Sequence, residues 1–264
     1  MEKIIAILAS GGIMLALALV FGALLVVCAH FFIARRDERI DRVEELLAKS
    51  NCGGCGRAGC AQFAEALVKG EAKLSDCRAT PQANKEKIAA LLGGGEIGEE
   101  TVAVVHCSGG HACYDKYDYR GYGDCASCEL IAGGVKACPV GCIGKKTCVG
   151  VCPTGALSVG DGGYAQVEKE KCISCGACIA DCPKKIIGRI PKAAKVYIAC
   201  SNHGKGKEVA ELCGHGCIGC GLCAKNCPQG AIEMKDGLPA IDYSKCVGCR
   251  VCVQKCPRKC IKEH

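Results

Sequence analysis

Polar and apolar residues are distributed very unevenly along this chain. From Ile4 to Ala34 there is no Asp, Glu, Lys or Arg. At about 1.5 Å per helical residue this run extends roughly 45 Å, more than the bilayer hydrocarbon core of about 30 Å. It is also too long for the apolar region of a cleavable signal peptide. We therefore predict a transmembrane anchor over residues 1–34, retained in the lipid bilayer.

Charges on either side of this run predict its orientation. Lys3 is the only cation before it, whereas Arg35, Arg36, Arg39 and Arg42 follow it. Cytoplasmic flanks of membrane helices carry an excess of Lys and Arg. We expect a single-pass protein of the cytoplasmic (inner) membrane, with everything after the helix on the cytoplasmic side.

Two β-type runs occupy similar places further along the chain. Residues 101–106 lead into Cys107, residues 196–199 lead into Cys200, and each cysteine is followed by Ser. We expect the two strands to pair with each other, which would bring Cys107 and Cys200 together.

Composition changes the picture because the chain is very rich in cysteine. Among 264 residues there are 28 Cys, 36 Gly, no Trp and only 4% aromatics. So few aromatic residues argue against one large core and favour several small modules held by crosslinks. In a reducing compartment, converging thiols are typical of metal or cluster sites rather than disulfides.

The formal charge of +7 counts every thiol as neutral. A four-iron cluster on four thiolates carries about −2, so five clusters would turn +7 into about −3. The apparent basicity is therefore no sign of nucleic-acid binding, and we expect no nucleic-acid partner.

The first cysteine unit follows the anchor. Cys52, Cys55 and Cys60 lie in a glycine-rich loop, and sixteen residues separate Cys60 from Cys77. Glycine lets a short loop turn three sulfurs toward one point, and a helix predicted over 61–69 returns the chain to Cys77. We expect a four-Cys domain over residues 35–95 that binds one [4Fe–4S] cluster, with zinc as the alternative.

A repeated ferredoxin motif is the most specific pattern in the chain. C-x2-C-x2-C-x3-C-P occurs three times, beginning at Cys172, Cys217 and Cys246, and a stretched version begins at Cys138. In such motifs three cysteines bind one four-iron cluster and the fourth binds its neighbour. Zinc ribbons use paired C-x2-C knuckles instead, which disfavours zinc here.

The segments between paired motifs alternate apolar and polar residues around a turn, which predicts β-hairpins. Two motifs joined by a hairpin make one bicluster ferredoxin module. We expect such modules at 131–190 and 213–264, with a one-strand connection at 96–130 and a strand and a helix at 191–212. The predicted fold class is α+β.

Crossed ligation within each module assigns sixteen cysteines to four clusters. The sets are Cys138, Cys142, Cys148 and Cys182; Cys152, Cys172, Cys175 and Cys178; Cys217, Cys220, Cys223 and Cys256; and Cys227, Cys246, Cys249 and Cys252. With the four-Cys domain, we expect at least five [4Fe–4S] clusters.

Eight cysteines remain outside these sets. Cys28 in the membrane span and Cys260 near the end are expected to be free thiols. The other six offer either a sixth cluster site or buried structural thiols. Such a site would use Cys107, Cys200 and Cys213 with one of Cys113, Cys125 or Cys128.

The order of these features resembles a known family over essentially the whole chain. A membrane helix, a C-x2-C-x4-C-x16-C domain and tandem ferredoxin modules are similar to the B subunits of Rnf ion-translocating ferredoxin:NAD oxidoreductases. The likeness includes residues 138–144, 200–206 and 213–220. It implies an anchored carrier that relays electrons between soluble ferredoxin and other subunits of a membrane complex, with Na⁺ or H⁺ transport in those subunits.

The residues themselves agree with one-electron chemistry. There is no catalytic triad and no nicotinamide or flavin motif, so we expect a subunit of a redox-driven translocase without a complete active site of its own. One apolar helix without acidic residues offers no ion site. Two alternatives remain open: an iron–sulfur subunit of another membrane oxidoreductase, such as a hydrogenase or reductase complex, and a stand-alone metal-binding or redox-sensing membrane protein.

Overall fold

The computed structural model describes the backbone of residues 2–32 and 37–264 and the side chains of 11–29 and 37–264. Its contacts divide the chain into two units, Met1–Asp41 and Arg42–His264. The end of the predicted anchor, at 33–34, lies outside the described residues, as do Arg35 and Arg36 from the prediction of orientation.

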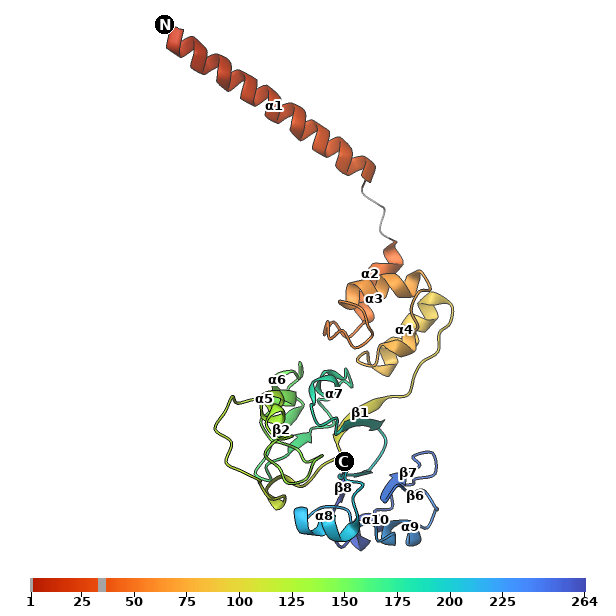
Figure 1. The fold of residues 1–264 in the computed structure, drawn as a ribbon. Helices are drawn as coiled ribbons and strands as arrows, with labels where there is room; N and C mark the ends of the chain where they lie inside the picture. The colour runs from red at the N-terminus through yellow and green to blue at the C-terminus, as the bar shows by residue number, and fades with distance from the viewer. Residues whose placement is uncertain (1, 33–36) are drawn as a thin grey trace. The chain divides into compact units, whose positions relative to one another are not determined.

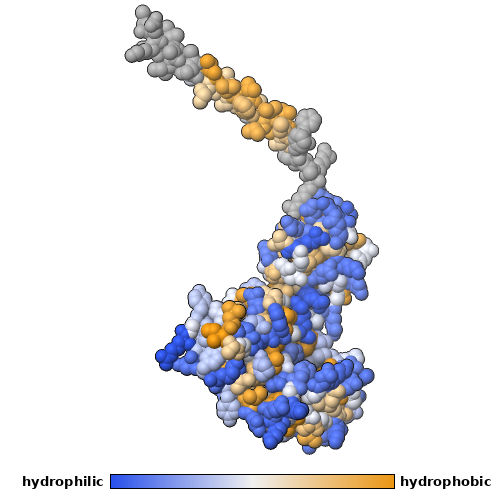
Figure 2. Space-filling view, in the orientation of Figure 1, coloured by the Kyte–Doolittle hydropathy of each residue, from blue (hydrophilic) through white to orange (hydrophobic). Residues whose placement is uncertain are grey.

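The first unit contains one long helix, α1, Glu2–Phe32 (Figure 1). Its Gly11–Ala29 stretch is long and apolar enough to cross a membrane, and none of this stretch is buried within the protein. Figure 2 shows hydrophobic side chains along that part of the helix. The prediction of a long apolar helix is confirmed.

The second unit begins within α2 and contains the helices around the first cysteine unit. These are α2 (Glu38–Leu46), α3 (Cys60–Val68), the 3-10 helix η1 (Leu74–Asp76) and α4 (Gln82–Leu92). α3 buries Phe63 and Leu67, and α4 buries Ile88. α4 ends where Gly93 takes a left-handed φ of 77°, which glycine adopts without strain. The helix predicted over 61–69 is therefore confirmed.

The described strands form four two-stranded antiparallel sheets. The pairs are β1 (Thr101–Val105) with β4 (Ile187–Pro191), β2 (Leu157–Val159) with β3 (Ala165–Val167), β5 (Val196–Ile198) with β8 (Ile261–Glu263), and β6 (Ile232–Lys235) with β7 (Leu238–Ile241). The hairpins β2–β3 and β6–β7 are those that the alternating pattern predicted. We call residues 101–191 the first half and residues 196–263 the second half.

The predicted pairing of the strands at 101–106 and 196–199 is wrong. β1 pairs with β4, which places Val102 opposite Ile190, and β5 pairs with β8. Each half is thus closed by its own first and last strands, because this pairing buries apolar side chains that both strands contribute. Nothing local in either strand indicates a partner that distant in sequence.

Short helices carry or adjoin the remaining cysteines. They are η2 (Gly110–Ala112), α5 (Cys125–Leu130), α6 (Thr147–Gly150), α7 (Ala177–Asp181), α8 (Gly206–Leu212), α9 (Leu222–Lys225) and α10 (Val251–Lys255). The two halves have small cores in which cysteines pack beside aliphatic residues, such as Cys148 beside Leu157 and Cys223 beside Ile232. Groups bound by these cysteines would therefore lie inside the cores.

Candidate metal centres

The four predicted ligands of the first cysteine unit line one cavity. Cys52, Cys55, Cys60 and Cys77 surround it, and we call this group the N-terminal site. Cys60 opens α3, and its backbone N–H donates to Oδ1 of Asn51 at 2.9 Å, which ties the start of the helix to the cysteine loop. Burial raises the pKa of the Cys55 thiol.

The first half holds a group that matches the second predicted ligand set. Cys152, Cys172, Cys175 and Cys178 form what we call site 2. Burial raises the pKa of Cys178 to about 11, and the charges of the other three sulfurs add to this effect because they lie nearby. The backbone N–H of Ala156 donates to Sγ of Cys152 at 3.3 Å.

A second cavity in the first half differs in one member from the other predicted set. It is lined by Cys142, Cys148 and Cys182, as expected, but its fourth cysteine is Cys125 and not Cys138. The backbone N–H of Cys125 donates to Oγ1 of Thr147 at 2.8 Å, which fastens the start of α5 beside Cys148. We call Cys125, Cys142, Cys148 and Cys182 site 1.

The loop of the first motif explains why Cys125 takes the place expected for Cys138. Five residues separate Cys142 from Cys148, as they separate Cys217 from Cys223 in the second half. Lys145 occupies the position that corresponds to Cys220. The first motif therefore lacks its middle sulfur, and α5 brings Cys125 to the cavity instead. Aligning the two motifs on these spacings would have signalled the missing cysteine.

In the second half, one cavity collects the third predicted ligand set. Cys217, Cys220, Cys223 and Cys256 line it, and we call them site 3. Cys260, predicted as a free thiol near the end of the chain, is buried in the same cavity with its Sγ 3.5 Å from Sγ of Cys256. This hydrogen bond lowers the pKa of Cys256 to about 5.

The fourth predicted set, Cys227, Cys246, Cys249 and Cys252, forms site 4. Burial raises the pKa of Cys252, and the nearby charges of Cys246 and Cys249 raise it further. Cys227 and Cys246 pack against the same core. The backbone N–H of Ala231 donates to Sγ of Cys227 at 3.3 Å, which repeats the contact at Cys152 in the first half.

One more cavity lies between the two halves and is lined by five cysteines. We call it the central cavity; its cysteines are Cys107, Cys113, Cys138, Cys200 and Cys213. Cys107 and Cys200 do come together as predicted, although their strands do not pair. The segments after the strands cross instead, with Ser108 N–H donating to the carbonyl oxygen of Ala199 at 3.0 Å. Cys128 is fully buried elsewhere, beside Val135 and Ile143.

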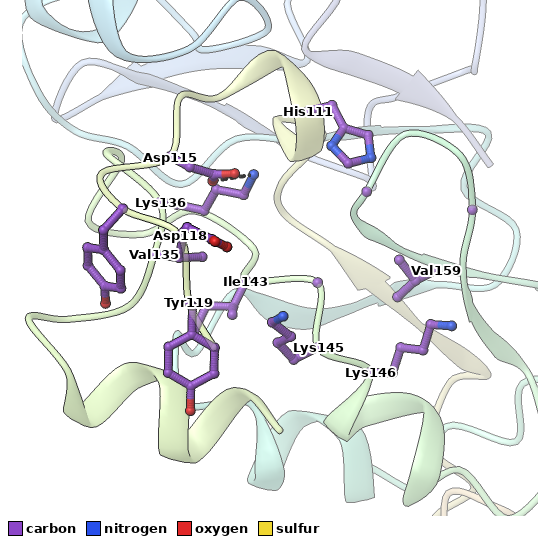
Figure 3. Close-up of a pocket in the computed structure, with 14 residues that line it drawn as sticks. His111, Asp115, Asp118, Tyr119, Val135, Lys136, Ile143, Lys145, Lys146 and Val159 are labelled. Carbon is purple, nitrogen blue, oxygen red and sulfur yellow. Dashed lines mark ion pairs between the residues drawn. The ribbon is translucent and has the colours of Figure 1, made fainter. Parts of the chain in front are cut away.

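A further cavity, of about 740 Å³, is not one of these groups. Figure 3 shows it lined by polar side chains that include His111, Lys145 and Lys146, with an ion pair between Lys136 and Asp115. Its described lining includes no cysteine. It therefore offers no sulfur ligands for iron.

Donor geometry distinguishes a cluster from a single metal ion. Within the described residues, no three Cys, His, Asp or Glu side chains converge in a way that would hold one metal ion. Zinc ligands all lie about 2.0–2.3 Å from one point. In a four-iron cluster each thiolate binds a different iron, so four cysteines surround a larger space. The cysteine-lined cavities fit the cluster arrangement and offer the soft sulfur donors that iron–sulfur clusters require.

Burial affects the protonation of the cysteine thiols when no metal is bound. It raises the pKa of Cys142 to about 11 and that of Cys148 to about 12. These thiols then stay protonated near neutral pH, since a buried thiolate is poorly solvated. Binding of iron must therefore displace their protons.

The cysteine groups of the second unit form a continuous series. Cys175 of site 2 also lines the cavity of the N-terminal site. Cys148 of site 1 and Cys178 of site 2 are buried in the same core, which joins these two sites. Backbone N–H groups of Cys142 and Cys217 donate to sulfurs in the central cavity at 3.3 and 3.4 Å. Sites 3 and 4 share one core.

Comparison with protein families agrees with this picture. An Fe-S cluster family matches residues 47–79, which contain the N-terminal site. A 4Fe-4S dicluster domain matches twice, at 141–186 and 216–260, and a second 4Fe-4S dicluster family matches 169–232. Iron–sulfur domains are thus present in both halves of the second unit.

Similar proteins extend the comparison to most of the chain. The B subunit of the Na(+)-translocating ferredoxin:NAD(+) oxidoreductase complex of Acetobacterium woodii is 38% identical over 91% of this chain and 73% of its own length. The B subunit of the ion-translocating oxidoreductase complex of Methanosarcina acetivorans is 40% identical over 85% and 86%. The B subunit of the proton-translocating ferredoxin:NAD(+) oxidoreductase complex of Clostridium ljungdahlii is 39% identical over 88% and 83%.

Proposed function

Because this chain belongs to the family of B subunits of ion-translocating ferredoxin:NAD oxidoreductases, we propose that it relays electrons between a soluble ferredoxin and the partner subunits of such a complex. At the coarser level, it is an iron–sulfur electron-transfer subunit of an ion-translocating oxidoreductase. Membership of this family argues against the two alternative functions, a subunit of a hydrogenase or reductase complex and a stand-alone metal-binding or redox-sensing protein.

The continuous series of cysteine sites is the observation that supports a relay. [4Fe–4S] clusters supply one-electron carriers when they are bound. The chain's own residues hold the sulfurs around each space, exclude water from the buried ones and direct backbone N–H groups at sulfur, as at Cys152 and Cys227. Such donors to sulfur tune reduction potential, which is the protein's main contribution to this chemistry.

We propose that the relay lies on the cytoplasmic face of the membrane and that α1 anchors it there. The apolar stretch Gly11–Ala29 and the cations that follow the helix in the sequence support this orientation. The relatives' names specify sodium in one case and protons in another, so the likeness selects neither ion. We assign ion transport to other subunits, because this stretch has no ionisable carboxylate or ammonium group.

The relay is tested with the full chain in detergent, loaded anaerobically with iron and sulfide. Reduced ferredoxin is added and the loss of the cluster absorption band is followed together with EPR signals. We expect ferredoxin to be oxidised while the chain is reduced, one electron at a time. Iron analysis should give at least about 20 iron atoms per chain if the N-terminal site and sites 1 to 4 are filled.

The control is the same chain stripped of iron by a chelator, which should leave ferredoxin reduced. A loaded chain that dithionite reduces but ferredoxin does not would contradict the ferredoxin link while leaving the clusters in place. A chain that takes up zinc and almost no iron would contradict the relay itself.

A further inference from the structure

The central cavity holds five cysteines that the sites described above do not use. Cys107, Cys113, Cys138 and Cys213 are buried, and Cys200 is partly exposed. Isolated buried cysteines are ordinary core residues, but five around one space are a sulfur-rich donor set. The central cavity is therefore the strongest unassigned feature of the described chain.

Matching segments of the two halves deliver four of these cysteines. Cys107 comes two residues after β1, and Cys200 two residues after β5. Cys138 and Cys213 each come four residues before the first cysteine of a ferredoxin motif. The fold thus brings equivalent sulfurs from both halves to one space.

Cys113 reaches the cavity through backbone pairing with the second half. It forms an antiparallel bridge with Cys213, supported by hydrogen bonds from Tyr114 N–H to the Leu212 oxygen at 3.2 Å and from Gly214 N–H to the Ala112 oxygen at 2.7 Å. Cys113, Cys138 and Cys213 pack together in one buried cluster. Three of the five cysteines are therefore direct neighbours.

The position of Gly109 identifies the fourth member of the group. A Cβ on Gly109 would lie 3.1 Å from Sγ of Cys213, 3.3 Å from Cβ of Cys113 and 3.7 Å from Sγ of Cys107. Cys107 thus belongs to the same cluster of side chains, and a residue larger than glycine would intrude among them. Cys200 packs against the core of the second half, as Cys107 packs in that of the first, but only Cys107 is among the three nearest neighbours of the Gly109 position.

A buried amide at the central cavity suits a thiolate ligand. Nδ2 of Asn202, a buried residue, donates to Sγ of Cys138 at 3.3 Å. A hydrogen bond donated to sulfur favours the thiolate form that a bound cluster requires.

We propose that Cys107, Cys113, Cys138 and Cys213 bind a further [4Fe–4S] cluster, which carries electrons between the two halves of the chain. Cys107 accepts the Cys142 N–H of site 1, and Cys213 lies four residues before Cys217 of site 3. One electron would enter from one half and leave to the other, with no atom transferred. The bridging role rests on the proposed function, whereas binding of the cluster does not.

Iron content and Mössbauer spectra of the full chain test the site. With the N-terminal site, sites 1 to 4 and this site filled, we expect about 24 iron atoms per chain. Cys113→Ala should remove about four of them, and Cys107→Ala gives a second reading if the first variant folds poorly. The double variant Cys113→Ala with Cys213→Ala should lose no more iron than either change alone, because both act on one cluster.

Two cysteine variants serve as matched controls. Cys128→Ala removes an equally buried sulfur outside the central cavity, and Cys200→Ala removes the fifth sulfur within it; both should keep about 24 irons. Iron loss in Cys200→Ala but not in Cys113→Ala would overturn the ligand set. About 20 irons in the parent, unchanged in Cys113→Ala, would overturn the site while leaving the relay intact, whereas an iron-free, zinc-loaded parent would overturn the proposed function.

Discussion

Gly54 packs directly against the backbone of Cys175, so that a Cβ on Gly54 would overlap the Cys175 carbonyl oxygen. Gly54 lies in the loop of the N-terminal site, and Cys175 belongs to site 2. The Oγ atoms of Thr101 and Ser174 are hydrogen-bonded at 2.6 Å close to this contact. Two cysteine groups from distant parts of the sequence are thus held in contact without a side chain between them.

Gly54→Ala should separate the N-terminal site from site 2. The added methyl group has no room, so one backbone must move, whereas the φ of Gly54 does not itself require glycine. Because electron transfer slows steeply with distance, we expect several-fold slower exchange between these two sites with unchanged iron content. Freeze-quench EPR after rapid reduction measures this rate. Gly123→Ala, which meets no atom within 4 Å, is the matched control and should leave it unchanged.

Cys125, and not Cys138, should bind the same cluster as Cys182. Cys125→Ala, Cys138→Ala and Cys182→Ser should each remove about four irons per chain when made alone. The double variant Cys125→Ala with Cys182→Ser should also lose about four, whereas Cys138→Ala with Cys182→Ser should lose about eight, because the latter two sulfurs line different cavities. The reverse pattern of iron counts would restore the assignment that the motif spacing predicted.

Crossed ligation predicts that Cys182 shares its cluster with Cys148 and not with Cys178. Combined with Cys148→Ala, Cys182→Ser should cost about four irons in total, since both residues line site 1. Combined with Cys178→Ala it should cost about eight, although Cys178 is much nearer in sequence. Equal loss of about four in the second pair would show that each motif binds its own cluster locally.

Cys260→Ala should lower the reduction potential of site 3 without removing iron. The Cys260 thiol is hydrogen-bonded to the Cys256 sulfur, and loss of a donor to a ligand sulfur makes the reduced cluster less stable. We expect a shift on the order of tens of millivolts in an EPR-monitored titration and a stability loss of about 1 kcal/mol from the small cavity. Loss of about four irons instead would identify Cys260 as a ligand.

Deleting residues 1–34 should convert the protein to a soluble, coloured form. The cysteine sites lie in the unit Arg42–His264, so iron content per chain should not change. Attachment to membrane partners should be lost, because the apolar helix is removed. Sedimentation with membranes and iron analysis provide the measurements. Co-purification of the truncated chain with the membrane complex at full yield would show that α1 is not the main attachment.

Local patterns were informative wherever ligands lie close together in sequence. The apolar run predicted α1, and the alternation of apolar with polar residues predicted both hairpins. The spacing of Cys52, Cys55 and Cys60 predicted that they share one site with Cys77, and all four line one cavity. Short loops leave few ways to arrange such residues, so spacing carries geometric information. The structure departs from this reasoning at Cys138, whose distance from Cys142 resembles a ferredoxin spacing although Cys138 lines the central cavity.

The sequence by itself determined that the chain has an apolar helix, a four-Cys unit and repeated ferredoxin motifs, because each is encoded within a few tens of residues. Only the tertiary structure decided that β1 pairs with β4, that α5 brings Cys125 to site 1, and that cysteines from both halves share the central cavity. These contacts join residues far apart in the chain. They form because closing each half buries its apolar strands, and the cysteines then meet where the closed halves pack together.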